Sequence, residues 1–126
     1  MKTTTSTSYV HLELSGKLLI ATFKKGIRID LGIARKIVDC RKRFTKNRTY
    51  PVLILNKGVI SMTREAREYF SSDEGTAGLR ASALVLRTSF GAMMGNIFIK
   101  VNKPRMPVKI FATEKGASKW LEQYVA

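Results

Sequence analysis

The chain is poor in the residues that build disulfides, metal sites and catalytic centres. Its 126 residues include one cysteine, Cys40, and one histidine, His11. A single cysteine forms no internal disulfide, which is typical of a reducing compartment, so we expect a cytoplasmic protein. No Cys/His cluster has metal-site spacing, and no glycine-rich phosphate loop is present. We therefore expect no catalytic residues, no metal and no cofactor in a protein that is not an enzyme. We interpret His11 as a strand-surface or packing residue and Cys40 as a core thiol.

Long hydrophobic runs and acidic residues are also scarce. No apolar stretch has the length of a transmembrane helix, and residues 1–8 lack the apolar centre of a secretory signal. Nine acidic residues stand against 23 basic ones, which gives a formal net charge of +14. Such an excess attracts anions, which can be nucleic acid, acidic lipid or an acidic protein surface. It is also compatible with a generally basic protein that has no anionic partner.

What is present is the composition of one globular domain, 44% hydrophobic and 25% charged. We interpret residues 1–8 as a flexible N-terminal tail and residues 9–126 as a single domain. Hydrophobic spacing predicts a hairpin over 9–23 and strands over 51–55, 81–86 and 108–112. Helices are expected to begin at Asp30, at Ser61 or Thr63, at Ser89 and at Thr113. The order β-β-α-β-α-β-α-β-α predicts an α/β fold with a mixed, mainly parallel sheet packed with helices.

Basic residues gather near the end of the first predicted helix. The cluster consists of Arg41, Lys42, Arg43, Lys46 and Arg48. These side chains suit contacts with phosphates, as in nucleic-acid binding. They equally suit the solvated C-terminal end of a helix, where cations interact favourably with the dipole.

A second candidate surface follows from the apolar residues between Phe90 and Val101, which recur with helical spacing over a wide face. That width fits packing on the sheet, a homodimer contact, or a pocket for an anionic amphiphile such as a lipid-like ligand. The candidate pocket residues are Phe90, Met94, Phe98 and Arg105.

The segment Pro51-Val-Leu-Ile-Leu-Asn-Lys-Gly-Val-Ile-Ser-Met-Thr-Arg-Glu-Ala-Arg resembles the central strand, loop and helix start of STAS domains, the anti-sigma-factor-antagonist-like modules. Residues 9–125 as a whole resemble small bacterial SpoIIAA-like (STAS-like) proteins of unknown function. The shared features are Tyr-Pro-Val-Leu, Ser-x-Thr-x-Glu-Ala-Arg-x-Tyr-Phe, Met-Gly-Asn-Ile-Phe-Ile-Lys-Val-Asn-Lys-Pro and a closing Trp-Leu. The resemblance implies a STAS-like fold and a non-catalytic module that docks onto a partner protein in bacterial regulation.

In the regulatory members of that family, a serine at the start of the helix after the central strand is phosphorylated. The matching positions here read Thr63-Arg64 followed by Glu65, so the usual phosphoserine is absent. Thr63 is either a substitute acceptor or a plain helix N-cap. The docking candidates on this loop and helix start are Lys57, Ser61, Thr63, Arg64 and Arg67. Because the two arginines make this end positive, we expect an acidic partner surface.

Overall fold

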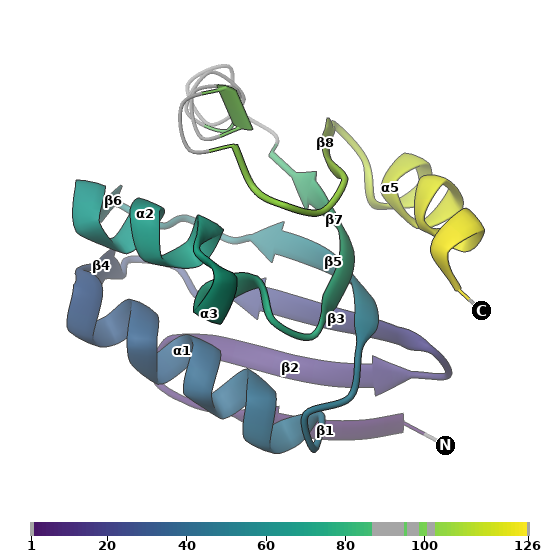
Figure 1. Ribbon diagram of the computed structural model, residues 1–126, viewed down its shortest axis with the longest axis horizontal. Coiled ribbons are helices and arrows are strands. Elements are labelled where there is room, and N and C mark those ends of the chain that lie inside the picture. Colours follow the sequence, from purple (N-terminus) through teal and green to yellow (C-terminus); the bar gives the residue numbers. More distant parts are fainter. Residues whose placement is uncertain (1, 87–94, 96–98, 101–102, 126) are drawn as a thin grey trace.

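A six-stranded mixed sheet forms the centre of the computed structural model, which describes residues 2–86, 95, 99–100 and 103–125 (Figure 1). The strand order is β1-β2-β3-β5-β7-β8. The bounds are β1 (Lys2–Ser6), β2 (Val10–Ser15), β3 (Leu18–Phe23), β5 (Tyr50–Asn56), β7 (Leu79–Val85) and β8 (Val108–Phe111). The first three strands are antiparallel, and β3, β5, β7 and β8 are parallel neighbours. This confirms the predicted fold class.

Helices cover both faces of this sheet. Their bounds are α1 (Leu31–Phe44), α2 (Arg64–Ser71), α3 (Asp73–Thr76) and α5 (Glu114–Leu121), the last continued by a 3₁₀ turn at Glu122–Tyr124. Figure 1 shows α1, α2 and α3 on one side of the sheet and α5 on the other. The core therefore has two layers, one on each face.

The central strand contributes to both layers. Val52 packs with Leu12 and Ile37 between the sheet and α1, whereas Leu53 packs with Leu121 beneath α5. Successive side chains of a strand point to opposite faces, so a continuous apolar run is what a strand covered on both sides requires.

Short polar side chains begin the helices where the sequence predicts. Asp30 accepts a hydrogen bond from the Ile33 amide at 2.8 Å and starts α1. Thr63 accepts from the Ala66 amide at 3.2 Å and starts α2. Thr113 likewise caps α5. Each cap satisfies an amide that has no partner within its own helix, and the predicted caps are confirmed at these three positions.

The N-terminal segment differs from its prediction. Residues 1–8 were expected to be a flexible tail, but Lys2–Ser6 form β1 and pair antiparallel with Ser15–His11 of β2. The prediction was wrong because an edge strand of threonines carries no apolar alternation, although β-branched threonine suits a strand. A further two-stranded parallel sheet, β4 (Arg28–Ile29) with β6 (Ser61–Met62), is absent from the predicted order. Most of the predicted helix from Ser89 to Val101 lies outside the described residues.

Candidate functional site

The carboxyl ends of β3 and β5 bring two loops together at one edge of the sheet. The strands run parallel and end in register at Phe23 and Asn56. Their arrowheads in Figure 1 point toward the side where β4, β6 and α2 begin. We call residues 24–28 and 57–67 the carboxyl edge. In α/β sheets this is the edge at which ligands and partners commonly bind.

Backbone hydrogen bonds hold the two loops of the carboxyl edge together. The Gly26 amide donates to the Gly58 carbonyl at 2.8 Å, and the Ile60 amide donates to the Ile27 carbonyl at 2.8 Å. The Asn56 side-chain oxygen accepts from the amides of Gly58 and Val59, both at 2.9 Å. The carboxyl edge is therefore preformed, so little conformational entropy is lost when a partner binds it.

The five predicted docking residues all lie on the carboxyl edge. Lys57, Ser61, Thr63 and Arg64 are exposed, and Arg67 is half-buried. Arg64 pairs with Glu68 one turn along α2 at 2.9 Å. Arg67 donates to the backbone carbonyl of residue 62 at 2.9 Å and ties α2 to β6.

Sequence reasoning missed an apolar residue on this edge. Ile60 is 52% exposed, the largest exposure of any large hydrophobic side chain among the described residues. Lys25 is exposed on the adjoining loop, and exposed Arg28 begins β4, where it is in register with Ser61. The sequence signal for an apolar contact here was the pair Val59-Ile60, which lies in a segment that was interpreted only as a loop. The carboxyl edge thus combines an exposed isoleucine with several basic side chains.

The basic cluster at the end of α1 is divided by the structure. Arg41 is only 7% exposed, and it donates to the carbonyls of Ala77 at 2.7 Å and Gly75 at 2.8 Å. Burial lowers its pKa to about 10, and the group stays charged at neutral pH. The inclusion of Arg41 among the anion contacts was wrong, because its guanidinium is turned inward and joins α1 to the segment before β7.

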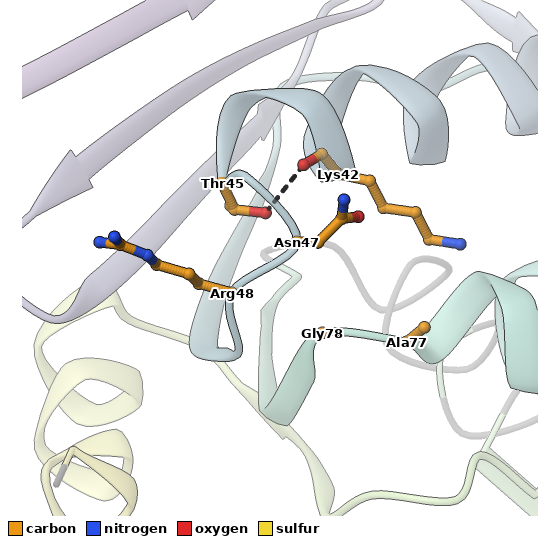
Figure 2. Close-up of a pocket in the computed structure, with 6 residues that line it drawn as sticks. All are labelled: Lys42, Thr45, Asn47, Arg48, Ala77 and Gly78. Carbon is orange, nitrogen blue, oxygen red and sulfur yellow. Dashed lines mark hydrogen bonds between the residues drawn. The ribbon is translucent and has the colours of Figure 1, made fainter.

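The other four members of the cluster lie at or near the surface. Arg43 is exposed and pairs with Asp39 at 3.3 Å. Lys46 is exposed at the end of α1, while Lys42 and Arg48 line a hollow of about 180 Å³ with Thr45, Asn47, Ala77 and Gly78. Figure 2 shows the Lys42 and Arg48 side chains extending to opposite sides of this hollow. Lys42, Lys46 and Arg48 therefore remain available for contacts, while Arg43 is already paired with Asp39.

The proposed amphiphile pocket is mostly untested by the structure. Phe90, Met94 and Phe98 lie outside the described residues. Arg105 is described, and it forms an exposed ion pair with Asp73 at 2.7 Å. The lipid-like ligand and the homodimer contact both stay predictions.

Three further findings concern metal binding, membrane spans and the single cysteine. Within the described ranges, no group of three or more His, Cys, Asp or Glu side chains could hold a metal ion. In the same part of the chain, no helix has the length and apolar character needed to span a bilayer. Cys40 is half-buried and packs against the core layer beneath α1.

Comparison with solved structures assigns the fold. The chain is similar to a crystal structure of an uncharacterized protein from the DUF3478 family with a SpoIIAA-like fold, from Shewanella loihica PV-4. The TM-score is 0.60 at 11% sequence identity, with 93% of this chain and 98% of that chain covered. The fold is therefore SpoIIAA-like, which confirms the resemblance at the level of architecture.

Comparison with family models assigns the family. Residues 12–125 match the model described as domain of unknown function DUF7793, and the chain belongs to that family. No curated protein matches the chain significantly.

Proposed function

We propose that this chain is a non-catalytic protein-interaction module that binds an acidic partner surface at the carboxyl edge and acts in bacterial regulation. The observation that carries the proposal is the exposure of Ile60 on a preformed edge that also presents Lys57 and Arg64. The SpoIIAA-like fold supports it as an analogy only, because function resides in the site rather than in the fold. The single cysteine supports a cytoplasmic setting.

The carboxyl edge has the composition of a small binding hot spot. Fully burying an exposed isoleucine side chain contributes about 1.5–3 kcal/mol, and Ile60 is 52% exposed, so burying the rest of it contributes about 0.8–1.5 kcal/mol. The surrounding cations contribute mainly to the association rate and to the choice of an acidic partner over a basic one. An acidic surface with an apolar contact at its centre is the partner that this edge fits.

The proposed docking does not depend on a phosphoserine. Arg64 occupies the position that the family pattern gives to that serine, and its side chain is exposed and paired with Glu68. The Thr63 hydroxyl is already engaged as the N-cap of α2. We therefore propose constitutive docking, set by apolar contact and charge.

A pull-down from lysate of the source cells, treated with nuclease, tests this proposal through matched variants. Ile60→Ser with Arg64→Glu removes the apolar contact and reverses one charge, and the glutamate at the start of α2 suits the helix dipole. Val125→Ser with Lys119→Glu makes matching changes at Val125, the other exposed large hydrophobic residue in the described part of the chain, and on α5. We expect the first variant to lose one protein by about tenfold or more, and the second to retain it. Equal recovery by all three proteins would exclude the carboxyl edge.

A further inference from the structure

Two hollows adjoin along one side of α1 and share Lys42. The first is the hollow of about 180 Å³ in Figure 2. The second has a volume of about 320 Å³ and is lined by Arg35, Lys36, Val38, Asp39, Lys42, Tyr69 and Glu74. We call the two together the α1 groove. It runs between α1 with the turn after it on one side, and α2, α3 and residues 77–78 on the other. Ile60 does not line it.

The α1 groove carries an excess of positive charge. Its lining includes four cations, Arg35, Lys36, Lys42 and Arg48, and two carboxylates, Asp39 and Glu74. Asp39 pairs with Arg43, whereas Glu74 accepts from the Tyr69 hydroxyl at 3.0 Å and keeps its negative charge. The four cations still outnumber the two carboxylates. Among the described residues, no carboxylate forms an ion pair with Lys36, Lys42 or Arg48. These three cations are available to a bound anion.

The same groove contains an aromatic surface. Tyr69 is half-buried, and the Arg35 guanidinium lies 5.7 Å from the centre of its ring. Its hydroxyl bond to Glu74 and its packing against the core fix the ring in place. Because the Arg35 guanidinium lies over this fixed ring, a nucleic-acid base can stack on the guanidinium that the ring supports.

Arg41 fixes the end of the groove that Ala77 and Gly78 line. Arg41 lies under this end and binds the carbonyls of Gly75 and Ala77, which fixes the wall opposite α1. A groove with fixed walls loses little entropy when a ligand orders against it.

We propose that the α1 groove binds single-stranded nucleic acid. Lys36, Lys42 and Arg48 contact backbone phosphates, and a base stacks against the Arg35–Tyr69 pair. Single-strand binding surfaces combine a basic groove with aromatic side chains in this way. An acidic peptide would use the cations but would leave the aromatic surface without a role, so the observations favour nucleic acid. The net charge of +14 adds a long-range attraction to any polyanion.

The test measures binding of the full chain to a fluorescein-labelled oligothymidylate of about 15 nucleotides by fluorescence anisotropy. Three phosphate contacts predict a slope of about −2 for the logarithm of the association constant against the logarithm of salt concentration. Lys42→Glu with Arg48→Glu is expected to weaken binding about tenfold or more and to reduce the slope by about 1.4. Lys115→Glu with Lys119→Glu on α5 makes the same net-charge change elsewhere and is expected to weaken binding by less than about threefold.

A second pair of variants separates stacking from charge. Tyr69→Phe keeps the ring and is expected to bind within about twofold of the wild-type protein. Tyr69→Leu removes the ring and is expected to weaken binding about fivefold or more. These substitutions leave the net charge at neutral pH unchanged, so long-range attraction does not account for a difference between them.

Four outcomes would overturn the proposal: no binding at physiological salt, equal losses in the groove and α5 variants, equal affinity of Tyr69→Leu and Tyr69→Phe, or tighter binding of polyglutamate than of the oligonucleotide. The carboxyl-edge variant Ile60→Ser with Arg64→Glu is expected to retain oligonucleotide binding. The failure of either proposal is therefore distinguishable from the failure of the other.

Discussion

The buried guanidinium of Arg41 provides the sharpest test of the structure. Arg41→Met keeps an unbranched apolar stem but lacks the guanidinium, so it removes both hydrogen bonds to the carbonyls of Gly75 and Ala77. The Gly75 bond is buried and the Ala77 bond is half-buried, so water can replace only the second readily. We therefore expect one backbone carbonyl to be left without a partner inside the domain.

The magnitude follows from these two bonds. A hydrogen bond from a charged donor contributes about 1.5–3 kcal/mol, and the variant is spared part of the cost of burying the charge. The free energy of unfolding is expected to fall by about 2–4 kcal/mol. For a domain of this size, that corresponds to a fall in Tm of roughly 8–16 °C.

This effect is measured by thermal and urea unfolding of four proteins: the wild type, Arg41→Met, Arg41→Lys and Arg43→Met. Arg41→Lys is expected to be intermediate, because one ammonium group reaches fewer carbonyls than a guanidinium fork. Arg43 is exposed and pairs only with Asp39, so Arg43→Met is expected to change stability by less than about 0.5 kcal/mol. Because the pKa of folded Arg41 is about 10, it is charged in both states at neutral pH, and these differences are expected not to vary with pH there.

If Arg41→Met unfolds within about 0.5 kcal/mol of the wild type, the reasoning is refuted. Arg41 would then be a surface cation like its neighbours Lys42 and Arg43, and it would not anchor the wall of the α1 groove.

Three further substitutions test other parts of the fold. Gly75→Ala places a Cβ 1.9 Å from the Tyr69 carbonyl oxygen, so we expect the free energy of unfolding in denaturant to fall by about 3 kcal/mol or more. The control Gly32→Ala meets no such contact and is expected to be tolerated. Thr63→Ala removes the cap of α2 and is expected to cost about 1 kcal/mol by thermal unfolding, while Thr63→Ser is expected to stay close to the wild type. Burial, and after it the hydrogen bond to Glu74, raises the pKa of Tyr69 above its usual value. Above that usual pKa the unfolded chain loses this proton first, so the free energy of unfolding is expected to fall more steeply with pH for the wild type than for Tyr69→Phe. Parallel pH profiles would refute this last expectation.

Local sequence patterns predicted the strands and helices that contain their own apolar run or capping residue. The apolar run over 51–55 became the central strand β5, and Asp30, Thr63 and Thr113 cap the helices as expected. These features depend on neighbours within a few residues, which sequence spacing records directly. The docking candidates Lys57, Ser61, Thr63, Arg64 and Arg67 came from the resemblance, and all five lie on the carboxyl edge.

Features that depend on distant residues were missed. The strand β1 is stabilised by pairing with β2 rather than by an apolar pattern of its own. The buried position of Arg41 depends on two carbonyls more than 30 residues away in sequence. A local signal did exist for it, because Arg41 follows Ile37 by four residues and Val38 by three, which places it on the buried face of α1. Its charge instead favoured the prediction that it is exposed like the neighbouring cations.

The most direct test of the proposed function is hydrogen–deuterium exchange of the chain, free and bound to the partner that the pull-down identifies. Docking at the carboxyl edge predicts slower exchange in residues 24–28 and 57–67, with α5 and the α1 groove unchanged. Protection confined to α5 or to the α1 groove, with residues 57–67 unaffected, would contradict the account and place the partner on another face of the protein.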